Sequence, residues 1–347
     1  TKLDENIKAV TKYVLNANSW NKEGVQMKFD AVVGNPPYQE MTGGYGTQAK
    51  PIYNLFINMS KSINSKYISM ITPSRWFSGG MGLNEFRKDM LNDTCLTKII
   101  DYPNTRDVFD SADIAGGVNY FLWDKSNKTE CEVTNVINNV KYSSSRNLNE
   151  FNTFVRFNQA IPIIRKVFNV QENGKTLENV VSPQKPFGLP TNYKPKDKGV
   201  PCWFIQKIGK RYADLKDIHD ENKLLNKWKL LVPRSPIAGQ TDFTKPVGFY
   251  YDGNTNIAKP GECCTESFIV AGAFDTEEEV KNFKSYLFTK TVRFLLLQAV
   301  VSQDVLRNKF CFVPDLGKYD RIYTDKYLCE KWNITDDEWK YIDSRIK

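Results

Sequence analysis

The amino-acid sequence predicts an α/β fold for its first half and a mixed α+β arrangement for its second half. Three observations lead to this prediction. Between residues 29 and 140, short apolar runs typical of buried strands alternate with amphipathic stretches, which is the pattern of a sheet containing parallel strands. From about residue 175 the pattern changes to short, irregular segments with many prolines and glycines. The length of 347 residues also favours two domains, which we place at 1–150 and 151–347.

The elements of the first half follow one another in a regular order. We expect a strand at 29–34, a helix at 51–64, a strand at 67–72, a helix at 83–92, and strands at 96–102 and 116–123. The last of these strands should be antiparallel to the others, and residues 133–142 are a candidate extension of the sheet. Before the first strand, residues 6–16 have the pattern of one modest helix.

The second half begins with a polar stretch at 143–153, which predicts a linker into a helix over 154–168. Further on, three glutamates at 277–279 follow two candidate caps, Asp275 and Thr276, and precede a long apolar stripe. This arrangement predicts one long helix over 275–301. Near the C-terminus, Thr335 opens a second capping pattern.

The composition is that of a soluble globular protein, with 41% apolar and 25% charged residues. No window approaches eighteen consecutive apolar residues, so we expect no membrane-spanning helix. The seven cysteines are odd in number and lack C-x-x-C spacing, which indicates reduced thiols of a cytoplasm rather than disulfides or a zinc site. The only histidine is His219, which excludes most His-based triads and His-metal centres. We therefore expect no bound metal.

The most informative residues are Asn35, Pro36, Pro37 and Tyr38, which follow the predicted strand at 29–34. Ligands of open α/β sheets bind just past the carboxyl ends of strands. The two prolines remove backbone donors, so the carbonyls there are free to face a ligand. Asn35 adds a side-chain carbonyl, and Tyr38 offers a flat face for stacking. These residues predict a pocket for a planar group that carries an amine.

Methylation of an exocyclic amine is the chemistry that needs such a pocket. The amine of adenine is a poor nucleophile because its lone pair is delocalised into the ring. If the Asn35 side chain and the Pro36 carbonyl accept its two hydrogens, the lone pair is directed at a methyl donor, and catalysis relies on positioning and electrostatics. A base inside a duplex cannot reach this pocket, so it must be flipped out.

Residues 29–38 resemble the catalytic motif of the amino-methyltransferases that modify DNA. Four later segments resemble, in order, the γ-class N6-adenine methyltransferases of restriction–modification systems, in particular the large type IIG-like enzymes that fuse methylase and specificity domain. These segments are residues 67–77, 83–91, 116–125 and 301–314. The resemblance implies a partial, Rossmann-like methyltransferase sheet made of the later strands, followed by a target-recognition domain. It also implies S-adenosylmethionine as the donor, double-stranded DNA as the partner and a bacterial cytoplasm as the location.

The resemblance assigns further roles. Trp123, or Phe121 as the fallback, would stack on the flipped base, although the run 120–123 is equally typical of a buried core strand. Tyr53 and Phe56 would contact the donor together with Asn35, although their spacing is equally that of a helix's core face. The basic and polar candidates for DNA contact are Ser74, Arg75, Lys185, Lys194, Lys196, Lys198, Lys207, Lys210, Arg211 and Arg234. The alternative to DNA contact is that the lysine-rich stretch is an ordinary solvated loop. The glycine-rich loop at 43–46 is a candidate cover for the flipped nucleotide.

One departure from the family matters. The family binds S-adenosylmethionine mainly through a Gly-rich turn upstream of the catalytic motif, and no strand followed by a Gly-x-Gly turn precedes Asn35. We therefore expect a fragment of a longer protein, or else a half whose donor-binding or nuclease part is separate, or a domain rebuilt from local elements. The alternative functions are a DNA-binding specificity module without activity of its own, and a methylase of RNA or protein. The sequence shows no acidic and lysine cluster of a nuclease, so we expect no endonuclease activity.

Overall fold

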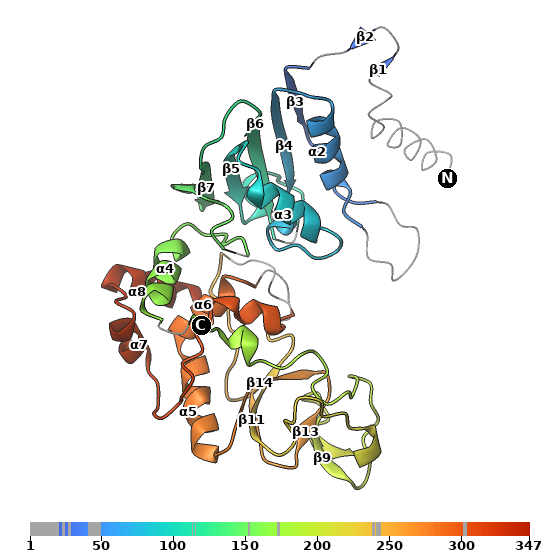
Figure 1. Ribbon diagram of the computed structural model, residues 1–347, viewed down its shortest axis with the longest axis vertical. Helices are drawn as coiled ribbons and strands as arrows, with labels where there is room; N and C mark the ends of the chain where they lie inside the picture. The colour runs from blue at the N-terminus through green and yellow to red at the C-terminus, as the bar shows by residue number, and fades with distance from the viewer. Residues whose placement is uncertain are drawn as a thin grey trace. The chain divides into compact units, whose positions relative to one another are not determined.

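The computed structural model describes residues 21–22, 25–26, 29–40, 50–112, 114, 116–151, 153–171, 174–237, 240, 244–300 and 304–347. The chain forms two compact units, Thr1–Asn158 (unit 1) and Gln159–Lys347 (unit 2), and each is presented by itself below (Figure 1). The helix predicted at 6–16 and the glycine-rich loop at 43–46 lie outside the described residues.

Unit 1 is built on a six-stranded mixed sheet with the strand order β3-β4-β6-β5-β7-β8. The strands are β3 (Ala31–Gly34), β4 (Tyr67–Pro73), β5 (Leu96–Tyr102), β6 (Val118–Asp124), β7 (Cys131–Ile137) and β8 (Val140–Arg146). β3 runs parallel to β4 and β5 runs parallel to β7, whereas β6 and β8 are antiparallel to their neighbours. Two short strands, β1 (Asn21–Lys22) and β2 (Val25–Gln26), form a separate antiparallel pair.

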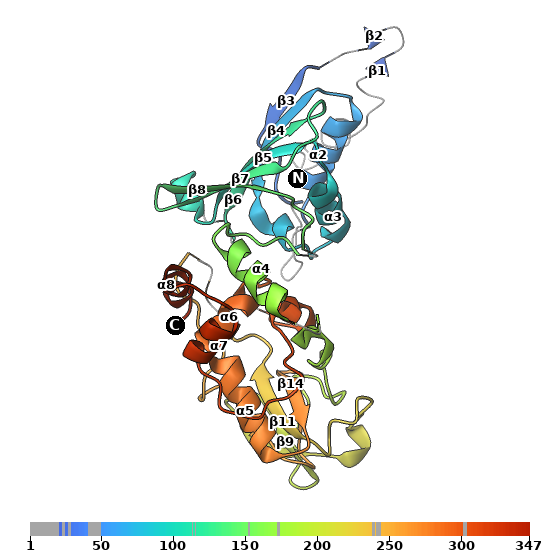
Figure 2. The same ribbon diagram turned by 60° about the vertical axis from the view of Figure 1, so that its left-hand side comes forward.

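Two helices, α2 (Tyr53–Ser62) and α3 (Asn84–Asn92), pack against one face of this sheet (Figures 1 and 2). Burial alternates along β4 and β6, so Ile68, Met70 and Phe121 point into the core beneath the helices while their neighbours remain partly exposed. This alternation follows from the pleat of a strand, which turns successive side chains to opposite faces. The core of unit 1 therefore lies between the sheet and the two helices.

The predicted α/β character of the first half is confirmed, including the antiparallel β6. The linker predicted at 143–153 is wrong in its first residues, because residues 143–146 belong to β8. The turn between β7 and β8 explains this: Asn138 and Asn139 have φ angles of 50° and 66°, and two successive left-handed residues make the tight hairpin turn that asparagine favours. The hairpin therefore continues the sheet into the polar stretch.

Unit 2 combines two three-stranded sheets with helices. One sheet has the order β10-β9-β13 and the other has the order β12-β11-β14. The strands are β9 (Val200–Trp203), β10 (Lys210–Ala213), β11 (Trp228–Pro233), β12 (Asn256–Ala258), β13 (Cys263–Cys264) and β14 (Phe268–Phe274). The helices are α4 (Ala160–Val170), α5 (Glu277–Phe288), α6 (Lys290–Leu297), α7 (Asp325–Lys331) and α8 (Asp336–Arg345). This mixed α+β arrangement is the one that the sequence predicts for the second half.

Two predicted helices differ from the observed ones for identifiable reasons. The helix predicted over 154–168 begins only at Ala160, which places Pro162 in its first turn. A start at residue 154 would put that proline in the helix interior, at a cost of about 3 kcal/mol. The long helix predicted over 275–301 is two helices, because the Thr289 side chain accepts from the Val292 amide and caps α6. The caps at Thr276 and Thr335 are present as predicted.

Candidate active site

The tetrapeptide Asn35–Tyr38 follows directly after β3, at the carboxyl edge of the parallel strands of unit 1. Pro36 is buried, Asn35 and Pro37 are exposed, and Tyr38 is half-buried. One proline thus anchors the segment while the Asn35 amide faces outward. This is the edge at which open α/β sheets bind ligands.

Backbone hydrogen bonds hold the segment against the start of α2. The Ile52 amide donates to the Tyr38 carbonyl (3.2 Å), and the Glu40 amide donates to the Lys50 carbonyl (2.9 Å). The chain therefore leaves the motif and returns to the same place before α2 begins at Tyr53. Among the described residues, none donates a hydrogen bond to the Pro36 carbonyl, so this acceptor is available to a ligand.

The Tyr38 hydroxyl is a buried polar atom within the motif. Burial raises the pKa of Tyr38, and the neighbouring Asn35 side chain offsets part of that rise. The hydroxyl nevertheless forms no well-aligned hydrogen bond with another described residue. A buried hydroxyl without a partner carries a free-energy cost of about 1–3 kcal/mol, and a polar ligand beside Asn35 and Tyr38 would remove this cost.

Further buried polar atoms without partners lie in the two elements that follow the motif. Within the described part of the chain, the Tyr53 hydroxyl, the Asn54 side-chain oxygen and the Trp76 indole nitrogen form no hydrogen bonds. Burial raises the pKa of Tyr53 far above its usual value, and the positive charge of Arg75 and the Trp76 backbone offset only part of this. Arg75 itself is exposed. The first turn of α2 and the segment after β4 therefore present unsatisfied polar groups near each other.

Tyr53 also packs as a core residue, since its ring makes an edge contact with Phe86 at 6.2 Å between centroids. Phe56 is half-buried on the same helix. The Tyr53 ring is therefore a core residue, as one of the two interpretations predicted. Its hydroxyl has no hydrogen-bond partner among the described residues and could bind a ligand.

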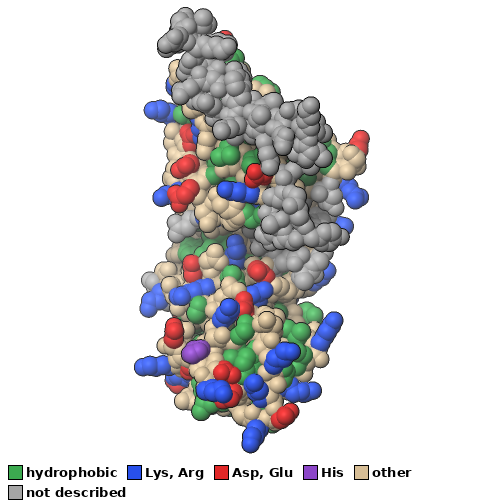
Figure 3. Space-filling model, turned by 90° about the vertical axis from the view of Figure 1, so that its right-hand side faces the viewer, with side chains coloured by type: hydrophobic (Ala, Val, Ile, Leu, Met, Phe, Trp, Pro, Cys, Tyr) green, Lys and Arg blue, Asp and Glu red, His purple; other side chains and the backbone are tan. Residues whose placement is uncertain are grey.

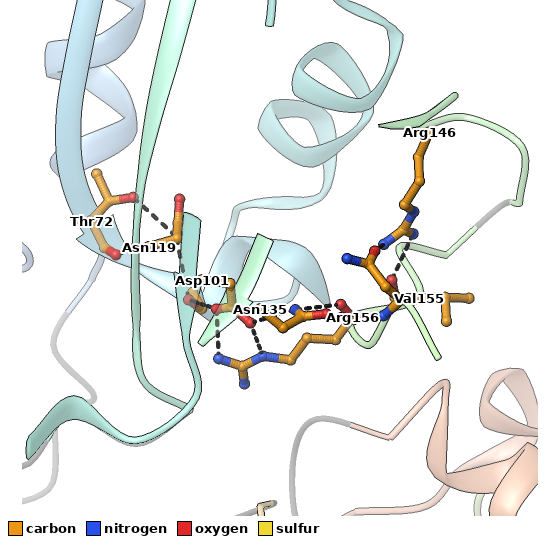
Figure 4. Close-up of polar contacts among 9 residues, drawn as sticks. Thr72, Asp101, Asn119, Asn135, Arg146, Val155 and Arg156 are labelled. Carbon is orange, nitrogen blue, oxygen red and sulfur yellow. Dashed lines mark hydrogen bonds and ion pairs between the residues drawn. The ribbon is translucent and has the colours of Figure 1, made fainter. Parts of the chain in front are cut away.

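A buried polar network lies at the same edge of the sheet and is shown in Figure 4. At its centre is Asp101, near the end of β5, which is fully buried. Arg156 binds both carboxylate oxygens, with Nε–Oδ2 at 2.7 Å and Nη2–Oδ1 at 2.8 Å, and the Ser74 hydroxyl donates to Oδ1 at 2.8 Å. Ser74 was expected to contact DNA, but its burial and this hydrogen bond make it a link between the ends of β4 and β5.

Amides extend the network on both sides of Asp101. The Asn119 amide donates to the Thr72 carbonyl (3.3 Å), and the Asn135 amide donates to the Arg156 carbonyl (2.9 Å). Sequence reasoning missed all of these residues except Ser74. A signal for Asp101 was present, because a single carboxylate in the apolar run 99–102 must find a partner when it is buried. Nothing in the sequence pointed to Arg156 as that partner.

Trp123 and Phe121 lie in a different place from the one that base stacking requires. Trp123 pairs with Ile68 near the amino end of β4, whereas β3 ends opposite Met70. Its indole nitrogen donates to Asp93 at 2.7 Å, and both rings belong to the core beneath the helices. Neither ring has a free face for a base, so this placement argues against the predicted stacking role.

Asp93 receives a second partner in the same corner of unit 1. The Lys61 ammonium lies 2.6 Å from its carboxylate and 5.8 Å from the centroid of the Trp123 ring. Burial alone would raise the pKa of Asp93, but the hydrogen bonds from Lys61 and Trp123 outweigh it and lower the pKa. This corner is a stabilising cluster of the core.

The basic residues expected to contact DNA lie mainly on the surface of unit 2. Lys194, Lys196, Lys198, Lys210 and Arg211 are exposed. Figure 3 shows Lys and Arg side chains spread over one face of this unit, with acidic side chains between them. Arg234 differs, since it is partly buried and pairs with Glu266 at 2.8 Å.

Two negative findings apply to the described ranges only. Within them, no group of three His, Cys, Asp or Glu side chains is arranged to hold a metal ion. The helices described there are also too short or too polar to span a bilayer.

With this geometry established, comparison with known proteins finds a family model that matches the N-terminal part of the chain. Residues 1–109 match the Eco57I restriction-modification methylase family. This segment, called the methylase segment below, contains the tetrapeptide, α2, β4 and β5. An uncharacterized adenine-specific methylase of Mycoplasma pneumoniae (strain ATCC 29342 / M129 / Subtype 1) is 34% identical over 100 residues, which are 28% of this chain and 24% of the relative. The chain thus spans about a quarter of the length of that relative.

Solved structures of restriction–modification proteins are also similar. The type IIL restriction-modification enzyme MmeI, solved in complex with DNA, has a TM-score of 0.46 and 9% identity, covering 86% of this chain and 47% of its own. The type IIG restriction endonuclease BpuSI has a TM-score of 0.38 and 11% identity, covering 90% of this chain and 48% of its own. The family match covers the methylase segment, which is residues 1–109 of the 347 in the chain.

Proposed function

We propose that the chain takes part in site-specific methylation of adenine N6 in DNA, with S-adenosylmethionine as the donor, within a restriction–modification system. The observation that carries the proposal is the placement of the tetrapeptide. It follows β3 at the carboxyl edge of the sheet, with the Asn35 amide exposed and the Pro36 carbonyl free of hydrogen bonds from other described residues.

In this proposal each residue of the motif has one task. The Asn35 side-chain oxygen and the Pro36 carbonyl accept the two hydrogens of the adenine amine, which directs the nitrogen lone pair away from the ring. The Tyr38 ring stacks on the flipped base. The proton of the amine leaves after transfer, so no strong base is required in the site. Catalysis then consists of orientation and fixed dipoles.

The unsatisfied groups beside the motif fit a polar cofactor. The Tyr38 hydroxyl and the Asn54 side-chain oxygen are buried without partners among the described residues, and a nucleoside with hydroxyl and amine groups would satisfy them. S-adenosylmethionine would supply an activated methyl group on a sulfonium. Tyr53 would contribute its hydroxyl, and Phe56 its half-buried ring, to the same region.

The proposal includes a further part that binds S-adenosylmethionine, on the same polypeptide or on a separate one. β3 is the outer strand of its sheet, and Val33 on it is 78% exposed. Among the described strands β3 pairs on one side only, and an exposed apolar residue on such an edge favours pairing with, or covering by, additional structure. Unit 2 would then supply DNA recognition, with its exposed lysines contacting phosphates.

The test is methyl transfer from S-adenosylmethionine to duplex DNA by the Asn35→Ala variant. Removal of one of two acceptors on the reacting amine should lower the rate at least about a hundred-fold, as for other single contacts to a reacting group. The matched control is Asn58→Ala, since Asn58 is an exposed asparagine on α2. It should leave the rate unchanged. Thermal unfolding of both variants should match that of the wild type, and an Asn35→Ala protein that methylates at the native rate would refute the assignment.

A second candidate is a DNA-binding specificity module that does not methylate by itself. The exposed basic residues of unit 2 favour it, because Lys194, Lys196 and Lys198 are placed to contact phosphates. Calorimetry with S-adenosylmethionine separates the two candidates. Heat of binding that disappears in a Tyr38→Ala variant supports the enzyme, whereas DNA binding without any donor binding supports the module.

A further inference from the structure

A cavity of about 370 Å³ opens in unit 2 where its two small sheets meet. One wall comes from Trp203 and Phe204, at the end of β9. The other comes from Pro233 and Arg234, at the end of β11, and from Phe268, at the start of β14. The volume is within the range of cavities that bind small organic ligands, and it exceeds what one or two water molecules occupy.

The lining of the cavity combines flat apolar surfaces with a few polar groups. Trp203, Phe204 and Phe268 supply aromatic rings, while Asn256 and Ser267 supply an amide and a hydroxyl. Such a combination suits a planar ligand that stacks on its faces and forms hydrogen bonds at its edges. A purely aliphatic ligand would leave the polar groups without partners.

Two of these polar groups are not used inside the protein. Among the described residues, the Ser267 hydroxyl is buried without a hydrogen-bond partner. The Asn256 side chain likewise forms no hydrogen bond within the described part of the chain. Asn254, which also lines the cavity, is different. Its amide donates to the Phe249 carbonyl (3.0 Å), and its oxygen accepts from the Tyr251 amide (3.0 Å). Asn254 shapes the wall, whereas Asn256 and Ser267 are available to a ligand.

The charges around the cavity argue against an anion as its occupant. Arg234 is paired with Glu266 at 2.8 Å and lies 3.7 Å from Asp304. On the opposite wall, the Trp203 indole nitrogen donates to Glu262 at 3.0 Å, and Lys210 pairs with the same carboxylate. Arg234, which lines the cavity, and Lys210, which lies beside it in β10, are thus each paired with a carboxylate. A phosphate group would meet these carboxylates, so a neutral planar group is the better fit.

Unpaired positive charge is found outside the cavity instead. Residues 185–211 contain six lysines and one arginine, with Asp197 as their only acidic residue. Of these lysines, Lys185 pairs with Glu266 and Lys210 pairs with Glu262. Lys207 lies at the tip of the β9–β10 hairpin, next to Gln206, which lines the cavity, and is exposed. No ion pair joins Lys207 to another described residue. A polyanion lying along this hairpin would therefore place its backbone beside the mouth of the cavity.

We infer that this cavity receives one unstacked base of DNA while Lys207 contacts the adjoining phosphate. The inference rests on the proposed function, because it assumes that unit 2 recognises DNA, and it adds a second base-binding pocket beyond the one beside Asn35. In this arrangement the aromatic walls contact the faces of the base, and Asn256 and Ser267 form hydrogen bonds with its edge. Asparagine amides and serine hydroxyls are suited to forming hydrogen bonds with the edges of bases.

The first experiment selects bound sequences from a pool of random-sequence DNA duplexes with the full chain. The wild type should enrich a preferred site. Asn256→Ala should relax the preference at one position by about ten-fold to a hundred-fold and leave the other positions unchanged. Asn222→Ala is the matched control, since Asn222 is an exposed asparagine of unit 2 outside the cavity lining, and it should enrich the wild-type site. Ser267→Leu, which places a larger apolar side chain in the cavity lining, should relax the same position as Asn256→Ala.

The second experiment asks whether the base at that position leaves the helix. A duplex mismatched there should bind the wild type about ten-fold more tightly or better, because the unpairing cost is already removed. Unchanged or weaker binding would mean that the base stays stacked, and would overturn the inference. An Asn256→Ala variant that enriches the wild-type site would also overturn it while DNA recognition stands. If the wild type enriches no sequence, the proposed function fails, and the inference fails with it.

Discussion

The ion pair between Arg156 and Asp101 gives the clearest prediction about the stability of unit 1. Asp101 is fully buried and accepts three short hydrogen bonds, two of them from Arg156. The Arg156 side chain is 11% exposed. In Arg156→Ala the carboxylate would remain buried with no cation, and the loss of one member of a buried pair costs about 3–5 kcal/mol. The Ser74 hydroxyl and the weaker Asn135 contact would remain, which favours the lower end of this range.

A matched ion pair in the same sheet provides the control. Lys98 and Glu132 lie 2.9 Å apart, but their side chains are 54% and 50% exposed. An exposed pair contributes about 0–1 kcal/mol, so Lys98→Ala should change the stability of unit 1 by less than about 1 kcal/mol. The two variants thus compare two ion pairs with similar N–O distances, one of them buried and the other exposed.

Hydrogen exchange measured by mass spectrometry is the appropriate assay, because peptides from β5 and β7 report on unit 1 alone. In Arg156→Ala the protection of these peptides should fall by roughly a hundred-fold to several-thousand-fold, since each 1.4 kcal/mol is a factor of ten. Peptides from unit 2 serve as an internal reference and should exchange as in the wild type. If Arg156→Ala lowers protection no more than Lys98→Ala does, burial of Asp101 is not the source of the effect, and the reasoning is refuted.

Two predictions concern pH and unit 2. Burial alone would raise the pKa of Glu262, but hydrogen bonds from Lys210 and Trp203 lower it below the usual 4.5. The resulting stability is present above about pH 4.5 and is lost as pH falls through the folded-state pKa, so Glu262→Gln should cost about 1.5–3 kcal/mol at pH 7. Urea unfolding tests this, and an equal cost at pH 3 and pH 7 would contradict it. Burial lowers the pKa of Lys229 to about 8 from 10.5. Between these values the unfolded chain binds more protons, so the stability of the wild type relative to Lys229→Met should rise with pH by up to about 3 kcal/mol. A difference that stays flat over this window would contradict that prediction.

The sequence allowed the strands and helices of unit 1 to be predicted because each buries one face. The alternation along β4 and β6 is visible in the order of apolar and polar residues, and it needs no knowledge of the partners. The boundaries were less accurate where a single side chain decides them. Thr289 ends α5 and caps α6 through one hydroxyl, and an apolar stripe that runs through it gives no sign of the break. Pro162, by contrast, was a readable signal for the late start of α4.

The position of the tetrapeptide after a strand could be predicted because it depends on neighbouring residues only. Asn35 and Pro36 directly follow β3, as the apolar run before them predicts, and their proposed contacts with a ligand stay a prediction. The role of Trp123 depended on which end of β6 lies near β3. Strand order and direction place Trp123 by the amino end of β4. The sequence of β6 alone does not determine which of its residues pair with which residues of β4. Arg156 and Asp101 are separated by 55 positions, which no spacing argument could connect.

The network around Asp101 also bears on catalysis, since it lies at the same edge of the sheet as the tetrapeptide. Ser74 joins the ends of β4 and β5 through Asp101, and β4 is the strand that pairs with β3. In the proposed mechanism Asn35 contacts the reacting amine directly, so its loss should remove activity without unfolding. Arg156 acts only through the strand ends, so Arg156→Ala should loosen the edge and weaken substrate binding together with stability. Under conditions in which unit 1 remains folded, the KM for DNA should therefore rise in Arg156→Ala while the rate at saturation stays close to that of the wild type. A loss of the saturated rate as large as that of Asn35→Ala would assign Arg156 to the reaction itself.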